Sequence, residues 1–216
     1  VGITPVSHDW KVPMCLSADG TRACQIVTPP STQVTLGGKC PATVFPNMEG
    51  AGYYRFSEDA ADWNKLIESA STLDSADQLT LWANTDAAMR GGYGAAGDYF
   101  SLIKTLAPAA QWDLVENQND SLHDLRVTGV LTQADAPKVQ ALLRNAYNAR
   151  LAALGLAAKP GEKPVDALTR QYLVQILLEE ARDPVLTAQL AKAGQTFLAS
   201  GGKDAGGIAP ELRIEA

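Results

Sequence analysis

The sequence predicts a mainly α-helical protein that begins with a small antiparallel β unit, and two observations indicate this class. Residues 1–56 are rich in Pro, Gly, Thr and Val and contain short stretches in which apolar and other residues alternate. Residues 57–216 are instead rich in Ala and Leu at helical spacing. Because alternation is typical of strands and a period of about 3.6 of amphipathic helices, we expect a domain boundary after Phe56. The helical domain is expected to be a superhelical array of antiparallel helix pairs.

Residues 10–17 carry the clearest strand signal, because every second residue is apolar. Asp19-Gly20 follows, a dipeptide that favours a type I′ hairpin turn. Residues 23–27 are expected to form the returning strand. Weaker strand candidates are residues 33–36, 43–45 and 52–56.

This hairpin predicts a disulfide. With a two-residue loop at Asp19-Gly20, residues equally far from the turn face each other, so Cys15 lies opposite Cys24. The pair falls on a non-hydrogen-bonded position, where α-carbons approach to roughly 4.5–5.5 Å, within the span of a disulfide. Cys40 is then free. A disulfide indicates an oxidising compartment, so we expect a periplasmic, cell-surface or secreted protein. The alternative is three buried thiols in a cytoplasmic protein.

Capping residues and glycines divide the rest of the chain into about seven helices. Ser75 begins a capping box that Gln78 completes, and Asp183-Pro184 is an N-cap followed by proline. Other helices are expected to begin at Asp59, Asp98 and Ala109. The four tryptophans lie at strand or helical spacing on apolar faces, so core positions are expected for Trp10, Trp63, Trp82 and Trp112.

Composition excludes several functions. The formal net charge of −6 argues against a nucleic-acid binder, which needs a basic surface to neutralise phosphates. No apolar run reaches the roughly 18 residues of a membrane span. His8 and His123 are far apart, and the sequence contains neither H-E-x-x-H nor C-x-x-C, so no zinc site is predicted. No G-x-S-x-G is present, although a Ser–His–Asp arrangement stays open.

Two further patterns have ordinary interpretations. Residues 92–97 match G-x-G-x-x-G, but they follow a predicted helix instead of a strand, so we interpret them as a helix stop and turn. Glu179, Glu180 and Asp183 could perform acid–base chemistry as paired carboxylates. Because neighbouring positions on a helix point in different directions, we favour a solvated acidic face.

The most specific stretch is residues 47–56. It resembles the Asn-x-x-x-x-Gly-Tyr-Tyr-Arg-Val segment of the large zinc aminopeptidases, of the aminopeptidase N and endoplasmic-reticulum aminopeptidase type. In that family the segment closes a β-sandwich domain and leads into a C-terminal helical domain. The matching residues are Asn47, Gly52, Tyr53, Tyr54 and Arg55.

Three shorter matches follow the family order. The first is similar to a Trp-x-Ile-Pro strand of the sandwich, the second to a helix with the pattern Trp-x-x-Leu-Ile, and the third to Ile-x-Pro-x-Leu-Arg near the end of the chain. They contribute Trp10, Pro13, Trp63, Pro210, Leu212 and Arg213. The chain departs from the family at Gln78 and Asn84, where the resemblance implies a charged pair.

The resemblance implies a zinc-dependent peptidase whose catalytic domain lies upstream in the same polypeptide. The family's H-E-x-x-H, distal Glu ligand, Gly-x-Met-x-Asn motif and catalytic Tyr have no counterpart here, so we expect no catalytic, cofactor or metal residue in this chain. Zinc is expected in the catalytic domain. The helical domain, truncated at its C-terminal end, would cover the active site and shape access of the peptide substrate.

A free-standing helical-repeat module that binds proteins or peptides is the alternative function, since helical arrays form concave binding surfaces. Spacing does not single out a groove residue among Arg126, Arg144, Arg150 and Arg170. A fragment without its neighbouring domains would expose apolar surface, so self-association is also expected.

Overall fold

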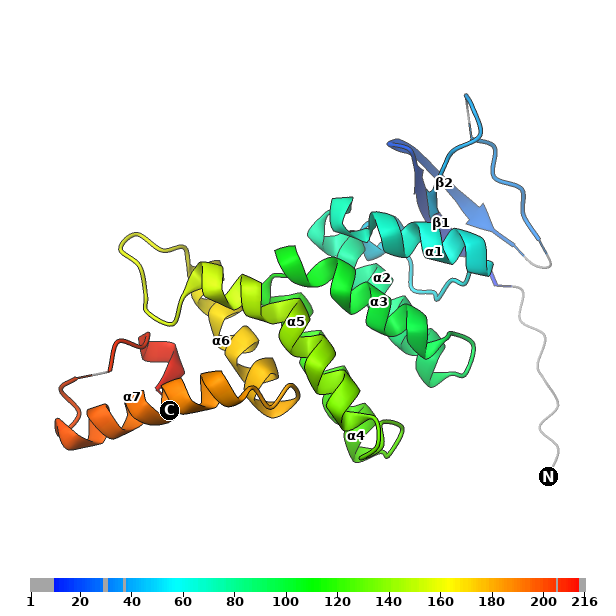
Figure 1. Cartoon of the computed structure of the whole chain (residues 1–216). Coiled ribbons are helices and arrows are strands. Elements are labelled where there is room, and N and C mark those ends of the chain that lie inside the picture. Colours follow the sequence, from blue (N-terminus) through cyan, green and yellow to red (C-terminus); the bar gives the residue numbers. More distant parts are fainter. Residues whose placement is uncertain (1–9, 29–30, 37, 205, 214–216) are drawn as a thin grey trace. The chain divides into compact units, whose positions relative to one another are not determined.

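The computed structural model describes residues 10–28, 31–36, 38–204 and 206–213. The chain divides into two compact units, Val1–Tyr99 and Phe100–Ala216. Seven α-helices and one three-stranded antiparallel sheet are present in the described residues (Figure 1). The protein is therefore mainly α-helical with a small β unit at its N-terminal end, as predicted. Whether Phe56 ends a domain stays a prediction.

The sheet of the first unit contains β1 (Val12–Ala18), β2 (Thr21–Val27) and β3 (Val44–Phe45) in the order β2-β1-β3. Cys15 faces Cys24 in the register, as the turn predicts. Asp19 and Gly20 have φ angles of 45° and 80°, the positive values that a type I′ turn requires.

Two weaker strand predictions are wrong. Residues 33–36 form no strand, and the carbonyl oxygen of Gln33 accepts a hydrogen bond from the side chain of Gln25. Residues 52–56 form no strand either, because side chains occupy backbone groups that a ladder would use. Asn47 binds both the N–H and the carbonyl of Gly52, and Asn84 accepts from the N–H of Phe56.

The helices of the first unit are η1 (Met48–Gly50), α1 (Ala60–Ser69), η2 (Ala70–Thr72) and α2 (Ser75–Arg90), followed by the start of α3 (Ala96–Leu106). Asp59 caps α1 as predicted, accepting from two backbone N–H groups. The predicted cap of α2 is wrong by one residue. Asp74 accepts from the N–H of Asp77, while Gln78 donates to the carbonyl of Leu73.

Two other helix starts also differ from the prediction. α3 begins two residues before Asp98, because the carbonyl of Ala95 already accepts from the N–H groups of Asp98 and Tyr99. The helix expected from Ala109 begins instead at Trp112, after the short 3₁₀ turn η3 (Ala107–Ala109). Proline at position 108 has no N–H, so it suits the first turn of this separate 3₁₀ segment.

The core of the first unit is aromatic and aliphatic. Phe56 packs edge-on against Phe45 and also contacts Trp63, with ring centroids 5.7 and 5.8 Å apart. Trp82 packs against Tyr99. The core prediction for Trp10 is wrong: it lies two residues before β1, beyond the hairpin register, and stays 62% exposed.

The second unit is built around α6 (Pro164–Glu179), which packs against α4 (Trp112–Val127), α5 (Ala136–Leu154) and α7 (Pro184–Ala199). It also contacts η4 (Pro210–Leu212). Trp112 is only half-buried and packs 6.0 Å from the ring of Tyr172, so it is not a core residue. Fully buried leucines on the facing sides of these helices include Leu122, Leu143, Leu173 and Leu177.

Among the helices of the described residues, none is both long enough and apolar enough to cross a bilayer.

Candidate functional site

The Asn47–Phe56 segment is a loop of the first unit whose backbone is held by side-chain hydrogen bonds. Asn47 is only 3% exposed. Its Nδ2 donates to the carbonyl of Gly52 at 3.0 Å, and its Oδ1 accepts from the N–H of Gly52 at 2.9 Å. One side chain therefore closes the loop from both sides.

Helix α2 fastens this loop at two points. The backbone N–H of Glu49 donates to Oδ1 of Asp77 at 2.5 Å, and the N–H of Phe56 donates to Oδ1 of Asn84 at 3.0 Å. Burial raises the pKa of the Asp77 carboxyl above its usual value, although the hydrogen bond from Glu49 opposes this shift. No sequence pattern singles out Asp77, and Asn84 stands out in the sequence only as a departure from a family pattern.

The backbone of this loop packs closely against helix α2. Gly50 has a φ of 62°, and a Cβ there would lie 2.8 Å from Oγ1 of Thr80. Glycine is therefore favoured here both by the left-handed backbone and by the close approach of Thr80.

The motif residues alternate in direction along the extended part of the loop. Tyr54 donates its hydroxyl to the carbonyl of Pro46 at 2.5 Å, and Phe56 lies in the aromatic core. Burial raises the pKa of Tyr54. Tyr53 is fully exposed, and Arg55, two residues further along, is exposed as well. The loop thus holds a tyrosine and an arginine outward on a fixed backbone.

The remaining motif residues of the first unit lie apart from this loop in the sequence. Cys15 and Cys24 form the predicted disulfide, with α-carbons 4.1 Å apart, and Cys40 is free and exposed. Pro13 is exposed on β1 opposite Ile26, whereas Trp63 is buried in α1.

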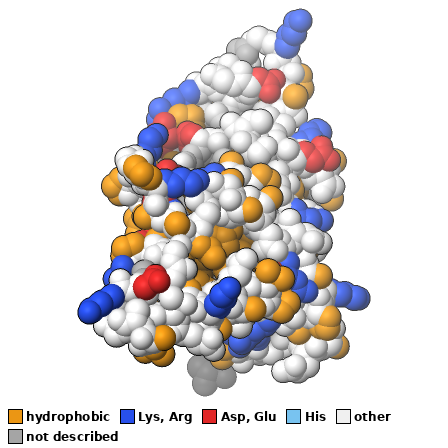
Figure 2. Space-filling model, turned by 60° about the vertical axis from the view of Figure 1, so that its left-hand side comes forward, with side chains coloured by type: hydrophobic (Ala, Val, Ile, Leu, Met, Phe, Trp, Pro, Cys, Tyr) orange, Lys and Arg blue, Asp and Glu red, His pale blue; other side chains and the backbone are white. Residues whose placement is uncertain are grey.

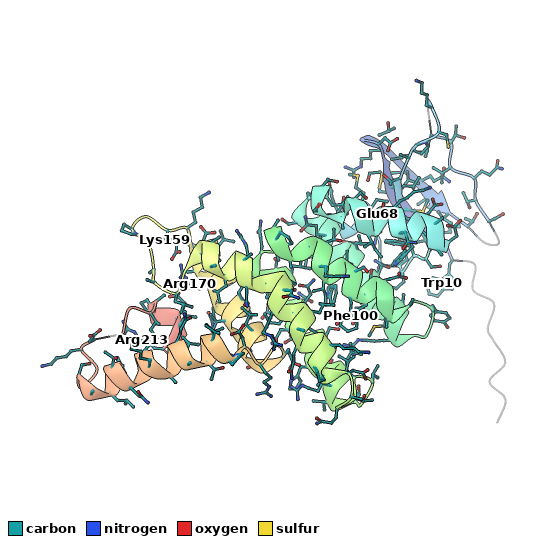
Figure 3. The ribbon with its side chains drawn as sticks, viewed as in Figure 1. Trp10, Glu68, Phe100, Lys159, Arg170 and Arg213 are labelled. Carbon is teal, nitrogen blue, oxygen red and sulfur yellow. A yellow bond between two sulfur atoms is a disulfide. The ribbon has the colours of Figure 1, made fainter. Side chains whose placement is uncertain are left out.

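In the second unit, the C-terminal motif is held by a buried arginine. Arg170 on α6 is completely buried and bonds the carboxylates of Glu162 and Glu211. Its Nε also donates to the carbonyl of Gly155 at 2.8 Å. In Figure 3, Arg170 lies between the segment that carries Lys159 and the segment that carries Arg213. The arginine therefore joins two loops to α6.

The residues of the C-terminal motif hold this segment against the second unit through different contacts. Pro210 opens η4, Leu212 is completely buried, and Arg213 lies over the ring of Phe197 at 5.9 Å. The N–H of Ala209 donates to the carbonyl of Leu156 at 2.7 Å.

A cleft of about 540 Å³ opens where α4 and α6 end and α5 begins. All of its lining residues belong to the second unit. Its charged members are Arg126, Arg182, Glu179 and Glu180. Its other members include Leu131, Thr132, Gln133, Val139 and Gln140.

One side of the cleft is closed by an ion pair. Arg126 donates from Nε and Nη2 to the two carboxylate oxygens of Glu180, at 3.0 and 2.8 Å. These hydrogen bonds raise the pKa of the Arg126 guanidinium. His123 lies beside the pair, with Nδ1 3.0 Å from Nη2 of Arg126.

The acidic residues that lie close together in the sequence each make different structural contacts. Glu180 pairs with Arg126, and Glu179 makes long contacts to Asn119 and Gln175. Asp183 caps α7 by accepting from the N–H groups of Val185 and Leu186. The G-x-G-x-x-G segment follows α2, and the N–H groups of residues 93 and 94 both donate to the carbonyl of residue 88.

Within residues 10–28, 31–36, 38–204 and 206–213, no group of three or more His, Cys, Asp and Glu side chains could hold a metal ion. His8 lies outside the described residues.

The chain is similar to a known protein family. The family model of the ERAP1-like C-terminal domain matches residues 43–215. The match begins at the segment containing β3 and includes both the Asn47–Phe56 loop and the C-terminal motif, while the disulfide-bonded hairpin precedes it. No curated protein matches the chain.

Proposed function

Because the chain belongs to the ERAP1-like C-terminal domain family, we propose that it is the non-catalytic C-terminal part of a zinc-dependent aminopeptidase. In the intact enzyme its helices cover the active site and restrict which peptides reach it. The observation that carries this proposal is the family match, which spans nearly all of the helical sequence.

The catalytic domain of the same polypeptide is the principal partner in this proposal. In this proposal zinc and its chemistry belong to that domain, and no catalytic step is assigned to this chain. This chain contributes two binding surfaces. One is the hydrogen-bonded loop that presents Tyr53 and Arg55, and the other is the cleft between helix ends. Tyrosine and arginine are enriched among residues that dominate binding energy at protein interfaces.

The test uses the intact polypeptide and its catalytic part produced without residues 43–213. We expect the intact enzyme to cleave long and short peptides at different kcat/KM, and the isolated catalytic part to lose this length dependence while still cleaving an amino-acid anilide. Equal length dependence in both would contradict the proposal. Anilide cleavage and zinc content show whether the catalytic part has folded.

A second measurement covers the case in which the catalytic part does not fold alone. Hydrogen exchange of the intact enzyme is measured with a non-hydrolysable long peptide and with a dipeptide analogue. Protection within residues 100–213 by the long peptide alone supports the proposal, and protection by neither contradicts it. The 216-residue chain alone, repurified with added zinc, should cleave no anilide.

The second candidate function is a free-standing helical module that binds peptides or proteins. The array of helices around α6 favours it, since stacked helices form peptide-binding surfaces without catalysis. The reading frame upstream of Val1 separates the two functions. An H-E-x-x-H motif there supports the aminopeptidase, and a start codon immediately before Val1 supports the module.

The disulfide motivates a proposal about location. A Cys15–Cys24 bond favours an exported protein, at the cell surface, in the periplasm or secreted, over a cytoplasmic one. Mass spectrometry after alkylation without reductant should label Cys40 alone. Labelling of Cys15 and Cys24 in protein taken from its native source would contradict export.

Exposed apolar residues also favour self-association of the isolated chain. Val127, Val130, Val185 and Leu198 are more than half exposed in the second unit. Hydrophobic side chains also reach the surface on the face shown in Figure 2, with Lys and Arg around them. Sedimentation should show concentration-dependent dimers or larger species, and a strict monomer at high concentration would contradict this.

A further inference from the structure

Helix α2 contributes a buried carboxyl group to the Asn47–Phe56 loop. Asp77 lies in the first turn of α2 and is only 6% exposed, and its Oδ1 accepts from the N–H of Glu49 at 2.5 Å. Glu49 has a φ of 58°, a left-handed conformation that costs energy for any residue with a Cβ. The contact with Asp77 therefore holds the loop backbone in a conformation that it does not favour by itself.

Two further carboxyl groups face Asp77. Asp74 lies one turn earlier and accepts from the backbone N–H of Asp77 at 2.9 Å, and Glu49 adds the charge of its own side chain. Arg22 on β2 lies 3.9 Å from Glu49, but both side chains are about half exposed, so this pair contributes little. η2 and β1, which pack against α2 and η1, contain no Asp, Glu, Lys, Arg or His.

This arrangement couples the closure of the loop to a proton. Burial raises the pKa of the Asp77 carboxyl, the hydrogen bond from Glu49 lowers it, and the neighbouring charges raise it, with a net upward shift. When the loop opens, water reaches the carboxyl and its pKa returns towards the ordinary value. Closure is therefore favoured most below the pKa of the open state, and this advantage is lost as the pH rises through the pKa of the closed state.

The other contacts that hold the loop keep their charge over this range of pH. Asn47 binds both backbone groups of Gly52, and Asn84 accepts from the N–H of Phe56, in each case through a neutral amide. Burial raises the pKa of Tyr54, so its hydroxyl stays protonated at neutral and acidic pH. Among these contacts, the carboxyl from α2 is the group whose charge changes between neutral and acidic pH.

We propose that the contact between Asp77 and Glu49 is a pH-sensitive latch, which closes the Asn47–Phe56 loop more firmly at acidic than at neutral pH. The same backbone carries Tyr53 and Arg55, so acidification also fixes the two exposed side chains that the loop presents. The inference concerns the first unit alone and does not depend on the proposed function.

Amide hydrogen exchange of the 216-residue chain measures this closure. The N–H groups of residues 49–52 are all hydrogen-bonded in the closed loop, so they exchange when it opens. Their protection factors, corrected for the intrinsic pH dependence of exchange, should be about fivefold or more higher at about pH 4.5 than at about pH 7.5, the lower end for two coupled equilibria. Protection equal to that of α1 at neutral pH would mean that the loop opens only when the whole unit unfolds, which overturns the inference.

Variants assign the effect to the carboxyl. Asp77→Asn keeps an oxygen for the N–H of Glu49 but cannot titrate, so protection should be high and equal at both pH values. Asp74→Asn keeps an N-cap oxygen and removes one like charge, so the increase on acidification should become smaller. Asp166→Asn, in the first turn of α6, should leave the increase unchanged.

Two results with these proteins overturn the inference. One is no increase of protection on acidification in the unmodified chain, and the other is an increase that persists in Asp77→Asn. If Asp77→Asn does not fold, an increase that Asp74→Asn leaves undiminished overturns the inference instead.

Discussion

Asn47 holds Gly52 through both halves of its side-chain amide, at 3.0 Å to the carbonyl and 2.9 Å from the N–H. This double contact supports the backbone that presents Tyr53 and Arg55. Because the side chain is buried, its loss leaves two backbone groups without partners instead of exposing them to water.

Asn47→Ala should therefore lower the free energy of unfolding by about 2–4 kcal/mol, since each unsatisfied buried group costs about 1–3 kcal/mol. Urea denaturation followed by circular dichroism measures the change. Asn64→Ala, an exposed asparagine on α1, is the matched control and should change stability by less than about 0.5 kcal/mol. If Asn47→Ala lowers the free energy of unfolding no more than Asn64→Ala does, the double contact contributes nothing to stability.

Arg170→Met tests the buried ion cluster of the second unit. Removing the guanidinium leaves Glu162 and Glu211 without their partner, and breaking a buried pair from one side costs about 3–5 kcal/mol. The C-terminal segment should also detach, so trypsin should cleave after Lys203 faster than in the unmodified protein. Arg213→Met, which removes a cation that packs on Phe197, is the control and should have a much smaller effect on stability.

The parts of the fold that depend on local chemistry could be predicted from the sequence. Two residues in a type I′ turn fix which partner each strand residue meets, so the Cys15–Cys24 pair follows from counting. The same is true of Asp183, whose cap and following proline need only neighbours in the chain. Asp74 and Ser75 are both good capping residues, and pattern alone could not choose between them.

The candidate sites depend on contacts between distant residues, which spacing does not encode. Arg170 meets Glu211 at a sequence separation of 41, and Glu49 meets Asp77 at a separation of 28. The cleft needs three helix ends to converge, so no single stretch of sequence contains it. Side chains that capture backbone groups explain the missing strand at residues 52–56, since alternation predicts a ladder only when those groups are free.

Asp77→Asn should stabilise the first unit at neutral pH. Burial raises the pKa of the Asp77 carboxyl, so its stabilising contribution is present below the unfolded pKa and is lost as pH rises through the folded value. An amide keeps an oxygen for the N–H of Glu49 without the charge. Urea midpoints should favour the variant at pH 7 and converge near pH 3, whereas the first-turn control Asp166→Asn on α6 should show no such gain. A variant less stable than the original at pH 7 contradicts this prediction.

The contribution of Asp183 to stability should depend on pH in the opposite direction from that of Asp77. Burial opposes its ionisation, but hydrogen bonds from Leu186, Asn148 and Val185 together lower its pKa from 3.8. A carboxyl with a depressed folded pKa stabilises the protein above the unfolded pKa, and this contribution is lost as pH falls through the folded value.

Asp183→Ala should therefore cost about 1–2 kcal/mol at pH 7, the usual effect of losing an N-cap with its charge. Asp183→Asn keeps a capping oxygen and should lose less. Urea denaturation at pH 7, 5 and 3 should show the gap between Asp183→Asn and the unmodified protein shrinking only below about pH 4, where the carboxyl of the unfolded chain becomes protonated. Asp59→Ala, at the exposed cap of α1, is the matched control, because its carboxylate also accepts two N–H groups but is not buried. If the two alanine variants lose equal stability at every pH, the buried contact from Asn148 to Asp183 adds nothing beyond ordinary capping.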